Sequence, residues 1–173
     1  MLALHHDGLP VVGLIDHPAL DVRASAAVGL GAWRNGQRIR LREPGTPTRP
    51  EAVRLVMSAR LNFVRGTDEG HVFDVLTRRF PNHRIYRAAY AHTVVVTGAA
   101  DRMVDAHNAI WDLAASQVLI EEAGGAYAVV RDIATPNGRI LSSVFGRPDV
   151  VEQILPVFEA PGSTGAAGAD PSR

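Results

Sequence analysis

Two short turn signals constrain the fold of this chain more than any other local feature. Asp7-Gly8 and Asn35-Gly36 each stand between short apolar runs in the first forty or so residues. Asp-Gly and Asn-Gly favour the positive φ angles of two-residue hairpin turns, whose twist matches that of paired strands. We therefore predict that residues 1–43 form an antiparallel meander, the remnant of an N-terminal sheet. The expected strands cover residues 1–6, 9–15, 22–28 and 32–39.

A segment rich in proline and glycine, residues 43–50, ends the meander and marks a change of pattern. Beyond it, short apolar runs alternate with stretches of helical spacing, which is typical of a layered α/β domain. We predict an α/β chain, an α+β layered sandwich, with a C-terminal domain over residues 51–158 and a disordered tail over 159–173. The expected strands are 53–58, 84–86, 102–105, 127–130 and 139–145, and the expected helices are 70–80, 88–97, 111–123 and 148–158.

Composition and charge exclude several classes of function. The chain has no cysteine, which rules out a disulfide scaffold, a thiol nucleophile and a cysteine-ligated metal site. Its 18 basic and 18 acidic residues balance, so the sequence carries no electrostatic footprint for a nucleic acid or an anionic membrane. No apolar run approaches the ~18 residues that span a bilayer. The N-terminus also lacks the features of a signal peptide, so we expect a cytoplasmic protein.

Asp112 is the residue that the local pattern singles out as a metal ligand. It stands in the first turn of the helix expected over 111–123, where aligned amide dipoles favour an ionised carboxylate. Such a carboxylate suits a hard cation such as Mg²⁺, although a helix-start Asp with no further role is the simpler alternative. The seven histidines show no metal-ligand spacing. Asp16 and Asp21, with Pro18 between them, are interpreted as turn residues that close a hairpin.

Four segments form an ordered set of longer motifs. They read D-G-L-P-V-V-G-L-I-D-H-P at 7–18, G-L-G-A-W-R-N-G at 29–36, G-A-A-D-R-M-V-D at 98–105, and W-D-L-A-A with a following E-A-G-G at 111–125. In this order the segments resemble the signatures of the inositol monophosphatase superfamily, and the likeness extends over residues 1 to about 147. The D-H-P and I-W-D-L-A-A letters are similar to those of its histidinol-phosphatase-like bacterial branch. The resemblance implies a truncated inositol monophosphatase-like fold.

The resemblance also implies a chemistry and a set of site residues. The family's members are Mg²⁺-dependent phosphomonoesterases of small metabolites, among them inositol phosphate, histidinol phosphate and nucleotide 3′-phosphates. Carried over by motif, Asp112 is a metal ligand, and Asp105 takes the place of a substrate-contacting glutamate that is one methylene longer. Arg87 and Ala88 lie in the substrate-side segment, where Tyr86-Arg87 replaces the family's Gly-Ser/Thr and adds bulk and charge.

The family's main acidic motifs have no counterpart in this sequence. Family catalysis relies on a Glu-Glu pair and on D-P-[IL]-D-G-[TS], which bind the metals that activate water, so the catalytic residues stay unassigned here. In the family these motifs precede the strand that begins here at Met1, and we expect a family member without its N-terminal segment. Three hypotheses remain open. The chain is a Mg²⁺-dependent phosphatase of a small phosphorylated metabolite, or a non-catalytic subunit that forms a homodimer or pairs with a complete homologue, or a fragment in which Met1 is internal to a longer enzyme.

Overall fold

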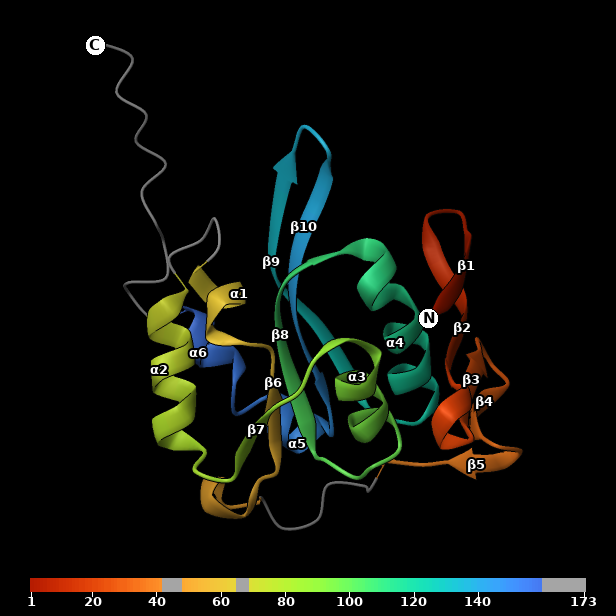
Figure 1. Cartoon of the computed structure of the whole chain (residues 1–173), viewed down its shortest axis with the longest axis horizontal. Coiled ribbons are helices and arrows are strands. Elements are labelled where there is room, and N and C mark those ends of the chain that lie inside the picture. The colour runs from red at the N-terminus through yellow and green to blue at the C-terminus, as the bar shows by residue number, and fades with distance from the viewer. Residues whose placement is uncertain (42–47, 65–68, 160–173) are drawn as a thin grey trace.

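The structure, a computed structural model, describes residues 1–41, 48–64 and 69–159. It contains two five-stranded sheets, with helices between them and on the far side of the second sheet (Figure 1). The predicted α+β layered sandwich is confirmed. The predicted connector at 43–50 and the predicted tail at 159–173 fall largely outside the described residues. No helix in the described part of the chain is long and apolar enough to cross a membrane.

The first sheet is the predicted antiparallel meander, with its strands in sequence order. Both hairpins turn at the expected dipeptides. Asp7 and Gly8 have φ angles of 49° and 80°, and Asn35 and Gly36 have φ angles of 48° and 80°, as a type I′ turn requires. The strands are β1 (Leu2–His6), β2 (Leu9–His17), β3 (Val22–Ala27), β4 (Gly31–Arg34) and β5 (Gln37–Ile39).

The two aspartates that follow the first hairpin have different places. Asp21 adopts the left-handed conformation after a short 3₁₀ turn, Pro18–Leu20, and closes the connection to β3 as expected. Asp16 is a strand residue of β2 instead, and its Oδ1 accepts a hydrogen bond from Arg23 Nε of β3 at 3.0 Å. The turn interpretation is therefore wrong for Asp16, because a cross-strand partner keeps it in the ladder.

The second sheet is mixed and follows the order β7-β6-β8-β10-β9. Strand β6 pairs in parallel with β7 and β8, whereas β10 is antiparallel to both β8 and β9. Strands β8 and β9 run beyond their predicted ends because β10 continues the ladder, pairing Ile140 with Ala109 and Gly138 with Thr135. The strands are β6 (Leu55–Met57), β7 (His83–Ile85), β8 (Arg102–Ala109), β9 (Ala126–Thr135) and β10 (Gly138–Gly146).

Helices α3 (Ala88–Val96) and α4 (Ile110–Glu122) fill the layer between the two sheets (Figure 1). They share one core with both sheets, including Ile15 of β2 and Val118 of α4. The approach of β2 to α4 requires a glycine, because a Cβ atom on Gly13 would overlap the backbone of Ala115. The N-terminal meander is thus packed directly against the helix that carries Asp112.

A second core lies on the other face of the second sheet. It is covered by α1 (Arg60–Val64), α2 (Gly70–Arg79), α5 (Pro148–Val151) and α6 (Leu155–Glu159), and a 3₁₀ turn at Pro50–Ala52 precedes β6. The sequence pattern did not predict α1. It also predicted one helix over 148–158, which is wrong. Pro156 has no amide hydrogen to offer the carbonyl of Glu152, and its ring crowds that carbonyl, so the helix breaks into two.

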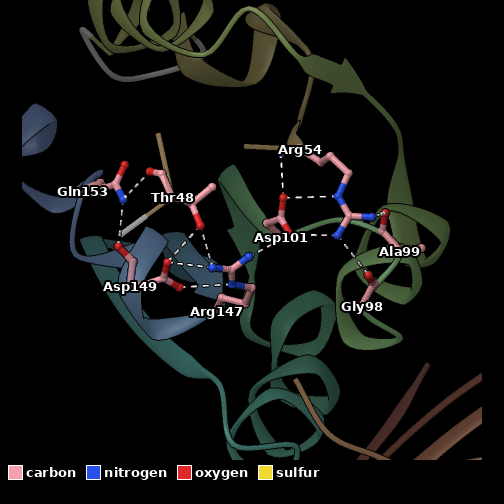
Figure 2. A network of polar contacts seen from close by, with 8 residues as sticks. All are labelled: Thr48, Arg54, Gly98, Ala99, Asp101, Arg147, Asp149 and Gln153. Carbon is pink, nitrogen blue, oxygen red and sulfur yellow. Dashed lines mark hydrogen bonds and ion pairs between the residues drawn. The ribbon is translucent and has the colours of Figure 1, made fainter. Parts of the chain in front are cut away.

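A polar network joins β6, β8 and β10 at one end of the second sheet (Figure 2). Asp101, just before β8, accepts a hydrogen bond from Arg54 Nη2 at 2.8 Å and lies 3.4 Å from Nη1 of Arg147. Arg147 also pairs with Asp149 at 2.7 Å. Burial raises the pKa of Asp101, but hydrogen bonds and charge from Arg54, together with the charge of Arg147, outweigh it and hold the pKa below its ordinary value. The charged groups of the network pair with one another, and we infer that the network stabilises the fold.

Candidate functional site

A cleft of about 690 Å³ lies at the opposite end of the second sheet, where β6 and β8 end and α3 and α4 begin. All the residues to which the sequence assigned a role line this cleft. They are Arg87, Ala88, Asp105 and Asp112. The tertiary structure therefore brings together residues that come from a strand and from the starts of two helices. The other lining residues are Met1, Ser58, Ala59, Leu61, Asn62, Tyr86, Ala89, His92, Met103, Asn108 and Trp111.

Asp112 occupies the first turn of α4, as its position in the sequence predicted. Its Oδ2 accepts a hydrogen bond from the backbone amide of Ala109 at 3.2 Å, which leaves Oδ1 for another partner. The side chain is exposed at the cleft. A carboxylate at a helix N-terminus is stabilised in its charged form by the helix dipole. Asp112 therefore caps its helix and still presents one oxygen to a ligand.

The start of α3 forms the opposite part of the cleft. Arg87 is the extended residue before the helix, and no side chain caps the amides of the first turn. Ala88 has a φ of 51°, a left-handed conformation that few residues other than glycine adopt. Such local strain is often retained at functional sites. Uncapped amides and an exposed guanidinium beside them form a good environment for an anion.

Asp105 is held from below by a buried histidine. His92 Nε2 lies 2.8 Å from Asp105 Oδ2, and His92 Nδ1 lies 2.6 Å from Ser116 Oγ. The side chains of His92 and Asp105 are only 3% and 6% exposed, and the His92 ring stands edge-on to Phe145 with centroids 5.2 Å apart. Asp105 thus lines the cleft while its side chain is held among buried, closely packed residues.

The sequence did not single out His92, Asn108 or Ser58 as cleft residues. His92 was one of seven histidines without a metal-ligand spacing, and its partner Asp105 is on a different element. Asn108 precedes the W-D motif by only a few positions, and that nearness was the one available signal. Its Nδ2 atom is buried without a hydrogen-bond partner. Sequence spacing does not report such contacts because they arise from the packing of α3 against β8 and α4.

The carboxylates of the cleft offer few ligands for a metal ion. Within residues 1–41, 48–64 and 69–159, no group of three or more His, Cys, Asp and Glu side chains lies close enough to hold one. Asp105 and Asp112 each have one oxygen bonded, to His92 and to the Ala109 amide, and one oxygen to spare, and of the two Asp112 is the exposed carboxylate. One carboxylate, assisted by phosphate oxygens and water, fits a weakly held Mg²⁺.

Comparison with known proteins agrees with the resemblance in the sequence motifs. The sequence model of the inositol monophosphatase family matches residues 1–152. A histidinol-phosphatase of Mycobacterium tuberculosis is 31% identical over 141 residues, which are 80% of this chain and 54% of that protein. A fructose-1,6-bisphosphatase/inositol-1-monophosphatase of Aquifex aeolicus is 30% identical over 131 residues, 70% of this chain and 46% of that protein. The chain spans about half the length of these curated relatives.

Solved structures share the fold. An inositol monophosphatase from Zymomonas mobilis superposes with a TM-score of 0.77 at 22% identity, over 91% of this chain and 61% of that one. An inositol monophosphatase from Anabaena superposes with a TM-score of 0.71 at 26% identity, over 91% of this chain and 64% of that one. The fold that the motifs implied is confirmed over nearly all of this chain.

Proposed function

The chain belongs to the inositol monophosphatase family, and we propose that its cleft is the phosphomonoester site of a Mg²⁺-dependent phosphatase of small phosphorylated metabolites. One observation carries the proposal. The first turns of α3 and α4 open into the same cleft, together with Arg87, Asp105 and Asp112. Amides, a cation and two carboxylates are the groups needed to bind a phosphate, a metal ion and the polar part of a substrate.

The phosphate would lie against the start of α3. The amides of this first turn have no side-chain cap, and they carry the positive end of the helix dipole. Arg87 adds a planar guanidinium, which donates two parallel hydrogen bonds to phosphate oxygens. The positive φ of Ala88 turns the chain sharply at this point, which supports a close approach of the backbone to the ligand.

Asp112 would contribute one carboxylate ligand to Mg²⁺. Mg²⁺ keeps several waters and commonly binds one or two carboxylates with substrate phosphate oxygens, so a single free oxygen on Asp112 suits it. When bound, the metal supplies Lewis-acid polarisation of a phosphoryl oxygen. The hydrogen bond from the Ala109 amide fixes the orientation of the Asp112 carboxylate, which stays ionised and so can bind the metal.

Asp105 would select the non-phosphate part of the substrate. A carboxylate accepts hydrogen bonds from hydroxyl and ammonium groups. The relatives' names include histidinol, whose phosphate ester carries an ammonium group, and fructose and inositol, which carry hydroxyl groups. Tyr86 and Trp111 give the cleft aromatic walls, and Trp111 is 70% exposed. An ammonium or an imidazole beside aromatic rings and a carboxylate is well accommodated, which favours a histidinol phosphate-like substrate.

A second candidate is a binding subunit without hydrolytic activity. Asp105 and Asp112 are the only carboxylates among the described lining residues, whereas two-metal hydrolysis needs a larger set. The outer face of the first sheet also exposes Leu2, Leu4 and Trp33, an apolar surface of the kind that partners cover. In this alternative a complete homologue supplies the missing ligands, or two copies of this chain form a homodimer that binds the ligand without hydrolysing it.

Phosphate release by the 173-residue chain tests the proposal. Histidinol phosphate and inositol phosphate are offered with Mg²⁺ and with a chelator, and Asp112→Asn is the control because its amide oxygen still caps Ala109. Release that needs Mg²⁺ and is lost in Asp112→Asn supports a phosphatase. Mg²⁺-dependent binding without release, measured by calorimetry, supports the binding subunit. If the chain shows no phosphate release and no ligand binding, both the phosphatase and the binding-subunit proposals are contradicted.

A further inference from the structure

His92 connects the polar floor of the cleft to α4. It comes from α3, its Nε2 atom faces Asp105 of β8, and its Nδ1 atom faces Ser116 of α4, at 2.8 Å and 2.6 Å. All three residues are buried, yet both His92 and Asp105 reach the wall of the cleft. Three separate elements therefore meet in one hydrogen-bonded chain beneath the site.

The order of the hydrogen-bond partners, Asp105, His92 and Ser116, sets the positions of the protons. Asp105 is an acceptor when ionised, so Nε2 of His92 carries the proton that it donates to Oδ2. In the neutral ring Nδ1 is then an acceptor, and the Ser116 hydroxyl donates to it. The hydroxyl thereby fixes the tautomer, as a second partner does for many functional histidines.

The same hydrogen bonds fix the direction of the Asp105 carboxylate. Without a partner, an Asp side chain turns readily about its last torsion, which is broad. Here Oδ2 is tied to His92, and the carboxylate lies at the cleft wall, so Oδ1 is the oxygen left for a ligand. Phe145 packs edge-on against the imidazole and restricts its tilt. Asp105 is therefore pre-organised before a ligand arrives.

We propose that His92 is a positioning residue that holds Asp105 Oδ1 toward the cleft and so sets its preference for phosphomonoesters bearing an O–H or N–H donor. This inference rests on the proposed function of the cleft as a phosphomonoester site. His92 does not touch the ligand. It acts, through Asp105, on the binding of the non-phosphate part of the ligand. Binding of the phosphate to α3 and Arg87 does not depend on it.

Selective binding separates this role from a merely structural one. We would measure the affinities of histidinol phosphate, whose ammonium is a donor, and of ethyl phosphate, which has no such donor, by calorimetry with Mg²⁺. His92→Phe keeps a ring against Phe145 but removes both hydrogen bonds. We expect it to weaken histidinol phosphate about tenfold or more and to change ethyl phosphate less than about twofold. His92→Gln places an amide N–H near the Nε2 position and should restore most of the loss.

The matched control is His17→Phe. His17 Nε2 lies 2.9 Å from Thr93 Oγ1, so this variant keeps a ring but breaks a similar bond to the same helix outside the cleft. It should leave both affinities unchanged. Nitrogen NMR of the wild-type imidazole gives a readout without ligand, in which Nε2 of His92 should carry the proton and Asp105→Asn should alter its resonance.

Each result decides one question. A loss confined to histidinol phosphate and restored by glutamine supports the positioning role. Equal losses for both ligands, or no loss for either, would overturn it and leave the proposed function standing. A wild-type chain that binds neither ligand would overturn the proposed function and this inference with it. If His92→Phe does not fold, Ser116→Ala decides, because it frees Nδ1 without leaving a charge unpaired. Wild-type selectivity in Ser116→Ala would contradict the inference.

Discussion

The contact between β2 and α4 makes Gly13→Ala the sharpest test of the fold. A Cβ atom at Gly13 would lie 3.1 Å from both the carbonyl carbon and the Cα atom of Ala115, with the carbonyl oxygen closer still. Because both partners are backbone, neither can turn aside as a side chain would. The new methyl group must push the sheet and the helix apart, and overpacking of this kind costs about 1–3 kcal/mol.

The expected strain is in the upper part of that range, because the nearest atoms belong to backbone. Alanine also stiffens the unfolded chain, which offsets about 0.4–1 kcal/mol of the strain. We expect the free energy of unfolding to fall by about 2 kcal/mol, and the melting temperature by about 4–8 °C for a chain of this size. Urea unfolding followed by circular dichroism measures the change.

A second glycine provides the control for Gly13→Ala. Gly8 has open space around its Cβ position but a φ of +80°, so Gly8→Ala adds backbone strain without a clash. It should cost about 1 kcal/mol. Gly13→Ala should also weaken Mg²⁺-dependent ligand binding, because α4 carries Asp112, whereas Gly8→Ala should not. A Gly13→Ala variant as stable as wild type would refute the described packing of β2 on α4.

Three further predictions follow from single side chains. The pKa of Asp101 is held below its ordinary value, so its pairing stabilises the fold above about pH 4 and is lost as the pH falls through the lowered pKa. Asp101→Asn should therefore lower the unfolding free energy by about 2 kcal/mol at pH 7 and flatten its fall below pH 4, as acid titration of stability will show. Burial raises the pKa of Tyr127 to about 12, so the neutral phenol stabilises the fold fully below about pH 10 and less as the pH rises through 12. Ultraviolet titration should show an ionisation near pH 12 that Tyr127→Phe removes, and its persistence in that variant would contradict the assignment. Asp112→Asn should weaken Mg²⁺-dependent phosphomonoester binding at least tenfold while shifting stability by less than about 0.5 kcal/mol, since the amide oxygen can still cap α4. Unchanged binding in calorimetry would remove Asp112 from the metal site.

Local chemistry made much of the fold predictable. The dipeptides at Asp7-Gly8 and Asn35-Gly36 take the positive φ angles of tight hairpins, and these turns fix the register of the neighbouring strands. Helix α4 could be predicted because its Gly124-Gly125 stop and its apolar spacing are local signals. Prediction failed where the deciding partner is distant in sequence or where a proline interrupts an otherwise helical pattern. Strand β8 is longer because β10 pairs with it, and the closing helix breaks because of Pro156.

The sequence by itself determined the family motifs and the residue types of the cleft. Asp112 was named from its position in the helix and from the resemblance, whereas Asp105, Arg87 and Ala88 were named from the resemblance alone, and the roles of all four stay predictions. Only the tertiary structure decided that they share one cleft and that His92 lies beneath Asp105. The physical reason is that local propensity acts within a turn or a strand, whereas a cleft forms where elements pack against each other. Hydrogen bonds such as that between His92 and Asp105 depend on that packing and leave no periodic trace in the sequence.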